Sequence, residues 1–214
     1  MLKNILKVNR PDFIELTTET KTVTAKWEND DYNLDDINVK LNQDNEYLAI
    51  FLTAQTSKVK WIKLRWNNLS WDKNVRFLGD AWERGYGDME WEGMNPNRFM
   101  PWYFCAKSEA KSICYGVKVR PSAMCFWQVD SLGMTLFLDV RCGGSGVNLK
   151  GRVIKLADVI ALLTCLGNGL VHGQHSGIAP LDHVSDFFHL FHGRQQDNSR
   201  IALQLVVHPH EGPI

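Results

Sequence analysis

The sequence predicts an all-β protein, a large antiparallel β-sandwich, and three observations support this fold class. Apolar and polar residues alternate with a period of two as far as about residue 160, which is typical of strands with one covered face. Turn-forming residues separate the alternating segments, and no helical pattern intervenes between them. At least nine candidate strands favour two extended sheets, a supersandwich, over a minimal immunoglobulin-like domain.

The first predicted strands lie between residues 13 and 68. Segments 13–19 and 22–29 both alternate. Residues 37–55 are interpreted as two strands joined by a tight turn at residues 42–45, because Asn and Asp tolerate turn conformations. Segment 59–68 should present one mixed face and one largely apolar face. The expected mixed face holds Val59, Trp61, Lys63 and Arg65, and the other holds Lys60, Ile62, Leu64 and Trp66.

The pattern resumes after residue 99. Segments 100–108 and 112–120 are expected to be neighbouring strands. Residues 123–144 predict a hairpin that turns through Asp130-Ser131-Leu132-Gly133, and its near-continuous hydrophobicity predicts a strand pair covered on both faces. Segment 152–164 is the last predicted strand.

The 214 residues carry a formal net charge of zero. Neither sign of charge dominates, so we expect no nucleic-acid partner and no membrane partner. The N-terminal apolar run is too short for a signal peptide, and no later run is long enough to span a membrane. We therefore expect a soluble, cytoplasmic protein, with a periplasmic or secreted location as the alternative if a signal has been removed.

The five cysteines are widely spaced and form no CxxC pair. An odd number without paired spacing favours buried thiols over a disulfide framework or a zinc site. The cysteines are Cys105, Cys114, Cys125, Cys142 and Cys165.

The composition changes near Cys165. All seven histidines follow that residue, whereas the last lysine is Lys155 and the last tryptophan is Trp127. We therefore divide the chain into a β-sandwich domain, residues 1–165, and a histidine-rich tail, residues 166–214, with a short helix predicted at 180–192. The spacings His172-x-x-His175 and His189-x-x-His192 lack a completing carboxylate or cysteine cluster, so no metal and no cofactor is expected.

Three further features are interpreted as structural. The run Gly143-Gly144-Ser145-Gly146 is not followed by the helix that a phosphate-binding loop needs, which favours a turn or bulge with positive φ. Asp130 starts the predicted hairpin turn. Asp139 lies inside a predicted strand, where we expect Arg141 or a backbone donor to pair with it.

The segment FLGDAWERGYGDMEW, residues 77–91, is the candidate functional site. It contains several carboxylates, and glycoside hydrolysis uses a pair of carboxyl groups as its catalytic groups. Its aromatic rings could stack on the C–H face of a sugar. A structural loop at the sandwich edge is the open alternative. The candidate sugar contacts are Asp80, Trp82, Glu83, Arg84, Tyr86, Asp88 and Trp91, and Glu90 is a further carboxylate.

The blocks FLGDAWERGYGDMEW, MPWYF, YGVKVRPSAMCFWQVD and LFLDVRCGGSGV together resemble the amino-terminal domain of bacterial α-galactosidase (melibiase)-like glycoside hydrolases of the family-36 kind. The resemblance covers roughly residues 10–165, and the blocks occur in the same order. It implies a large β-sandwich that precedes a (β/α)₈ barrel, and in that family the barrel carries both catalytic aspartates. For Asp80, Trp82, Glu83, Arg84 and Tyr86 it implies a position near the barrel mouth, without a catalytic role.

The chain departs from this family after the sandwich. A (β/α)₈ barrel takes about 250 residues, so we expect neither a barrel nor a catalytic pair within these residues. The change of composition favours a truncated or frame-shifted gene as the hypothesis. The sequence therefore predicts a domain that is inactive alone, with an α-galactoside or other carbohydrate and a separate barrel as expected partners. A stand-alone carbohydrate-binding module and a structural domain that forms homo-oligomers remain open alternatives.

Overall fold

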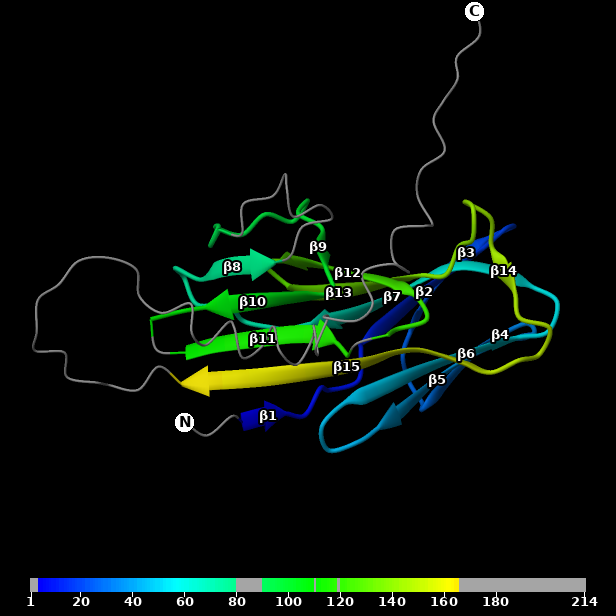
Figure 1. Cartoon of the computed structure of the whole chain (residues 1–214), viewed down its shortest axis with the longest axis horizontal. Helices are drawn as coiled ribbons and strands as arrows, with labels where there is room; N and C mark the ends of the chain where they lie inside the picture. The colour runs from blue at the N-terminus through cyan, green and yellow to red at the C-terminus, as the bar shows by residue number, and fades with distance from the viewer. Residues whose placement is uncertain (1–3, 80–89, 110, 119, 166–214) are drawn as a thin grey trace, which may run out of the picture. The chain divides into compact units, whose positions relative to one another are not determined.

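The structure is a computed structural model that describes residues 4–79, 90–109, 111–118 and 120–165 (Figure 1). The described part is an antiparallel β-sandwich, as the alternating pattern predicts, and it contains no helix. The helix predicted at residues 180–192 and all seven histidines lie outside the described residues.

The first sheet, sheet A, has eight strands. They are β1 (Asn4–Leu6), β4 (Asp31–Leu34), β5 (Ile37–Gln43), β6 (Leu48–Ala54), β8 (Arg76–Gly79), β10 (Tyr103–Lys107), β11 (Lys111–Val117) and β15 (Ile154–Cys165). Their order is β4-β5-β6-β15-β11-β10-β8, and β1 also pairs with β15.

The second sheet, sheet B, has seven strands. They are β2 (Phe13–Thr18), β3 (Thr22–Lys26), β7 (Lys58–Asn67), β9 (Met100–Pro101), β12 (Met124–Asp130), β13 (Gly133–Asp139) and β14 (Val147–Asn148). Their order is β3-β2-β7-β13-β12-β9, and β14 also pairs with β7.

The core lies between the two sheets and is built from alternate residues of their strands. Ile14 and Leu64 from sheet B and Leu52 and Phe104 from sheet A are almost fully buried in one cluster, together with Trp127. Since side chains alternate across a strand, the intervening residues form the outer faces. Burial of these large apolar side chains is the main stabilising contribution, about 2 kcal/mol for each.

The predicted face of Val59 is wrong, because β7 contains a β-bulge at this point. The pairing of β2 with β7 shifts register, because Thr17 faces Trp61 while Thr18 faces Val59. The strand therefore contains one extra residue, which breaks strict alternation. Val59 is fully buried with Ile62 and Leu64 instead of lying on the mixed face.

The β12–β13 hairpin turns where the sequence predicts, but only one of its faces is buried in the core. Cys125 and Trp127 point into the core. On the other face Met124 is 43% exposed, and Phe126 and Phe137 are half-buried. The expectation of two covered faces is therefore wrong for the described residues, because aromatic side chains give an exposed sheet face the same apolar pattern as a buried one.

Two other boundaries differ from the prediction. The β5–β6 turn lies two residues later than expected, and it is closed by the Asp44 amide donating to the Tyr47 carbonyl at 2.9 Å. The predicted strand at 100–108 breaks at Trp102, which has a φ of 66°. The chain changes sheets there, so β9 belongs to sheet B and β10 to sheet A.

Two of the cysteines contradict the prediction of free buried thiols. Cys105 and Cys114 face each other across β10 and β11 and form a disulfide with a Cα–Cα distance of 4.0 Å. Cys125 is a buried free thiol, as expected, whereas Cys142 is a free thiol on the surface. The side chain of Cys165 lies outside the described residues.

The glycine-rich run is a turn, as predicted. Gly143 and Gly144 have φ values of 58° and 82°, and a β-bridge joins Cys142 to Ser145. Two consecutive residues with positive φ are typical of a type I′ turn. The Gly146 amide then donates to the Glu19 carboxylate at 2.6 Å, which fixes this turn beside β2.

Candidate functional site

The segment 77–91 begins on β8, the edge strand of sheet A. Six of its predicted sugar contacts lie outside the described residues: Asp80, Trp82, Glu83, Arg84, Tyr86 and Asp88. The structure describes the two ends of the segment, Phe77–Gly79 and Glu90–Trp91. These ends show how the segment is held.

Backbone pairing joins the two ends. The Phe77 amide donates to the Glu92 carbonyl at 2.7 Å, and the Glu92 amide donates to the Phe77 carbonyl at 2.9 Å. Arg98 reinforces this pair, because its guanidinium donates to the Phe77 carbonyl at 3.2 Å and lies 3.4 Å from the Glu92 carboxylate. Phe77 itself is buried in the core, so the base of the segment is anchored to the sandwich.

Close packing fixes the point where β8 ends. A Cβ atom on Gly79 would lie 2.3 Å from Cγ of Met100. Met100 is fully buried and pairs with Trp127 of β12. Glycine at position 79 therefore lets the edge of sheet A approach the edge of sheet B.

Trp91 is the one predicted contact residue that the structure describes. It is half-buried, and the Lys107 ammonium lies 5.7 Å from the centroid of its ring. A cation near the ring is a cation–π arrangement. Trp91 is therefore next to a positive charge at the base of the segment, and Glu90, its neighbour, is exposed.

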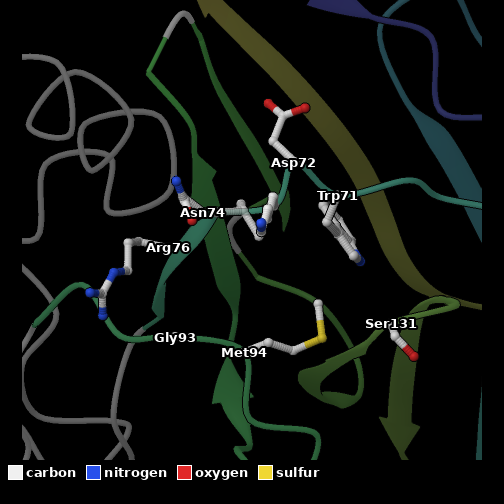
Figure 2. A pocket seen from close by; sticks show the side chains of 9 residues that line it. Trp71, Asp72, Asn74, Arg76, Gly93, Met94 and Ser131 are labelled. Atoms are coloured by element: carbon white, nitrogen blue, oxygen red, sulfur yellow. The ribbon is translucent and has the colours of Figure 1, made fainter.

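A pocket of about 520 Å³ lies beside this base (Figure 2). We name it the Trp71 pocket. Its lining comes from the β7–β8 connection, from the first residue of β8, from the two residues that follow Glu92 and from the β12–β13 turn: Trp71, Asp72, Lys73, Asn74, Val75, Arg76, Gly93, Met94 and Ser131. Figure 2 shows Trp71, Met94 and Ser131 on one side of the pocket, with Asn74 and Arg76 on the other.

Trp71 is held rigidly in this pocket. Its indole N–H donates to the Asp130 carbonyl at 2.9 Å. Its ring meets Phe77 edge-on, with 5.2 Å between centroids, and Phe104 in a similar way at 6.3 Å. The hydrogen bond and the aromatic contacts fix the ring against the core.

Asp130, whose carbonyl accepts the Trp71 hydrogen bond, is held in place by hydrogen bonds to its own carboxylate. Its two carboxylate oxygens each accept a hydrogen bond from the Arg65 guanidinium at 2.8 Å. Oδ1 also accepts hydrogen bonds from the Leu132 and Gly133 amides. The Arg65 hydrogen bonds are the largest cause that lowers the pKa of Asp130 below its usual range. The carboxylate is therefore a structural anion of the turn, as the sequence predicts.

The lining of the Trp71 pocket has the chemistry of a binding site for a polar ring. Its lining combines one aromatic wall with hydrogen-bonding side chains that include Lys73, Asn74 and Arg76, and such a combination can hold a polar ring. Among the described residues that line it, Asp72 is the only carboxylate.

Sequence reasoning missed this pocket. The segments that form it, residues 71–76 and 93–94, are polar connections without a strand pattern, and the fold brings them together. The single signal in the sequence is Trp71, a large aromatic residue inside the polar run NNLSWDKN.

In the described part of the chain, no group of three or more His, Cys, Asp or Glu residues is placed to hold a metal ion. A search of the same residues for a helix long and apolar enough to cross a membrane also finds none. Comparison of the chain with models of known protein families and with curated protein sequences finds no match.

Proposed function

We propose that this chain is the non-catalytic β-sandwich domain of an α-galactosidase-like glycoside hydrolase, a protein of bacterial carbohydrate metabolism. In the complete enzyme, a (β/α)₈ barrel would hydrolyse terminal α-galactosides with retention, by a carboxylate nucleophile and a carboxylic acid. The sandwich would pack against that barrel, and the segment 77–91 would form one wall of its sugar site.

The observation that carries this proposal is the convergence of the four sequence blocks that resemble this family. They contribute β8, β10 and β11, which are consecutive neighbours in sheet A, and β9, β12 and β13, which are consecutive neighbours in sheet B. Two of the blocks meet at the anchored base of the segment 77–91, because Gly79 of the first block packs closely against Met100 of the second. Loops that carry function are typically presented by such a rigid scaffold.

An exposed aromatic patch on sheet B supports the packing role. We name it the Phe99 patch, and it consists of Phe99, Met124, Phe126 and Phe137. Phe126 and Phe137 stack with 4.5 Å between centroids, and Phe99 contacts both rings. Phe99 is 49% exposed and Met124 is 43% exposed. Contiguous apolar groups on a surface are typical of interaction sites, and we assign this patch to the barrel.

Three measurements on the purified chain test the proposal. An aryl α-galactoside should not be hydrolysed, because the catalytic pair belongs to the barrel. Isothermal titration with galactose, melibiose or raffinose should give no heat for the isolated sandwich, and adding a separately produced α-galactosidase barrel should form a complex. Hydrolysis by the chain alone, or failure to bind any such barrel, would contradict the proposal.

A stand-alone carbohydrate-binding module is the second candidate, and the Trp71 pocket favours it. A module of this kind should bind galactosides without a barrel. Binding should then weaken in Trp82→Ala, in Trp91→Ala or in Arg76→Ala, and the variant that weakens it identifies whether the segment 77–91 or the Trp71 pocket binds the sugar. A Leu132→Ala variant, altered on an exposed turn, is the matched control.

A further inference from the structure

A second pocket, of about 380 Å³, lies between the β7–β8 connection and strands β10, β11 and β15. We name it the Ile113 pocket. It shares Trp71, Asp72 and Val75 with the Trp71 pocket, and its remaining lining is different: Leu6, Asn68, Leu69, Ser70, Ala106, Ser108, Lys111, Ile113, Tyr115 and Leu163.

The floor of the Ile113 pocket is the inner face of sheet A. Ile113 of β11 faces Leu163 of β15 in register, and both side chains are half-buried. The neighbouring strands β10, β11 and β15 are visible side by side in Figure 1. In sheet B, β7 ends at Asn67, and the polar connection that follows, residues 68–75, lines the hollow instead of a strand.

This arrangement leaves apolar surface without a close partner. Inner-face side chains of a sandwich normally interdigitate with those of the opposite sheet. Here Ile113, Tyr115 and Leu163 keep part of their surface open to the hollow. A ligand that covers apolar surface gains about 25 cal/mol for each Å² removed from water.

The walls of the pocket are preformed. Tyr115 stacks on Phe104, with 5.4 Å between centroids and 24° between the ring planes. Trp71 is fixed by its hydrogen bond to the Asp130 carbonyl and by its edge contact with Phe77. Binding therefore requires little ordering of these rings, which reduces its entropic cost.

The charged side chains at the rim of the Ile113 pocket indicate which ligand charge it favours. It carries one carboxylate, Asp72, and one ammonium, Lys111, together with the hydrogen-bonding side chains of Asn68, Ser70 and Ser108. A rim with balanced charge favours a neutral ligand, because a charged head would meet repulsion as well as attraction. Hydroxyl groups can both donate to and accept from such side chains.

We propose that the Ile113 pocket is a binding site for a small uncharged molecule with a flat apolar ring system and hydroxyl groups at its edge. The ring system would cover Ile113 and Leu163 between the aromatic walls, and the hydroxyl groups would meet the rim. The volume lies within the range of small-molecule sites, roughly 300–1,000 Å³. This inference does not depend on the proposed galactosidase role.

Fluorescence titration with N-phenyl-1-naphthylamine, a neutral two-ring probe, tests the site. We expect saturable binding at one site per chain. Ile113→Trp fills the hollow, so it should weaken binding about tenfold or more, which corresponds to about 1.4 kcal/mol. Ser70→Trp, altered at an exposed position, should obstruct the mouth and weaken binding without disturbing the floor.

Two controls make the result specific. Arg76→Ala changes the Trp71 pocket and should leave the probe affinity unchanged. The probe 8-anilinonaphthalene-1-sulfonate has the same ring body with an added negative charge, and it should bind about tenfold more weakly. Circular dichroism confirms that each variant is folded. The inference is overturned if the neutral probe does not bind, if both tryptophan variants bind it as tightly as the parent chain, or if the charged probe binds more tightly.

Discussion

Asp130 links its own turn to strand β7 and to the half-buried ring of Trp71. Its carboxylate accepts from Arg65 of β7 and from the amides of its own turn, while its carbonyl accepts from Trp71. The side chain keeps 37% of its surface exposed, so solvent screens the ion pair and limits its contribution to stability.

The variant Asp130→Asn tests this connection. It removes the charge that Arg65 pairs with, and we expect the free energy of unfolding at neutral pH to fall by about 1 kcal/mol. Urea unfolding measures the change. Asp31→Asn, altered on the exposed residue that begins β4, is the matched control and should unfold like the parent chain.

The same pair predicts a pH dependence. Because the pKa of Asp130 is lowered in the folded state from its ordinary value of 3.8, its stabilising contribution is present above that value. The contribution is lost as pH falls through the lower, folded pKa. The difference in stability between the parent chain and Asp130→Asn should therefore shrink in acid, and a difference that stays constant down to about pH 2 would contradict this cause.

Gly133 permits a close approach that no other residue could make. A Cβ atom at this position would lie 1.9 Å from the Trp66 carbonyl oxygen, and the contact is with backbone, which cannot rotate away. We expect Gly133→Ala to lower the free energy of unfolding by about 3 kcal/mol. Gly93→Ala is the control, since nothing lies within 4 Å of its added Cβ, and thermal unfolding of both variants should separate them clearly.

At the scale of single residues, interactions between near neighbours in the sequence could be predicted. Asp139 is paired by Arg141 and Asp130 caps its own turn, as expected, because both depend on residues two or three positions away. The Trp71 pocket could not be predicted, since it depends on Trp71, Met94 and Ser131 meeting through the fold. The outcome for Asp80, Trp82, Glu83, Arg84, Tyr86 and Asp88 stays a prediction.

At the scale of elements, the β10–β11 hairpin contains the clearest departure from the sequence prediction. Cysteine spacing alone does not predict which thiols meet, because pairing depends on strand register. Cys105 and Cys114 are nine residues apart, and the register places them opposite each other. Cys105 is fully buried and Cys114 is 9% exposed, so the bond is protected from reductants while the sandwich is folded.

The double variant Cys105→Ala/Cys114→Ala tests the contribution of this bond. A disulfide that closes a loop of about ten residues should stabilise the fold by about 2–3 kcal/mol, mainly by restricting the unfolded chain. Chemical unfolding measures the loss. Cys142→Ala, which removes an exposed free thiol, should have little effect.

A thiol assay checks the bond directly. Of the five cysteines, two should fail to react when the unreduced chain is unfolded, and reductant should restore them. Reductant should lower the stability of the parent chain and leave the double variant unchanged. Reaction of every thiol before reduction would show that the bond is absent.

Strand existence was predictable for most of the sandwich because alternation reports directly on a half-covered sheet. Two of the errors occur where alternation is broken locally. The bulge between Trp61 and Val59 reverses the face of Val59, and the positive φ of Trp102 divides one apolar run between two sheets. Neither feature changes the composition of its segment, so neither could be detected in the pattern.

At the scale of the whole molecule, the outer face of sheet B is not a simple polar surface. The Phe99 patch lies beside charged residues of β7 that are already paired, because Lys63 contacts Glu15 at 2.6 Å and also lies 5.2 Å from the Phe137 ring centroid. Paired charges around an exposed apolar centre are typical of an interface with a polar rim. A structural domain that forms homo-oligomers is one of the alternatives that the sequence leaves open, and a contiguous exposed apolar patch makes self-association its expected consequence.

Sedimentation velocity over a range of concentrations tests that consequence. We expect the isolated chain to associate reversibly through the Phe99 patch, with Phe99→Glu and Met124→Glu each raising the dissociation constant about tenfold or more. A charge there would have to be buried without a partner, which is costly. Leu132→Glu introduces the same charge at a residue that is 68% exposed on a turn, so it should leave association unchanged. If the three variants behave alike, association does not involve the patch. A parent chain that stays monomeric up to about 1 mM would contradict the expected self-association.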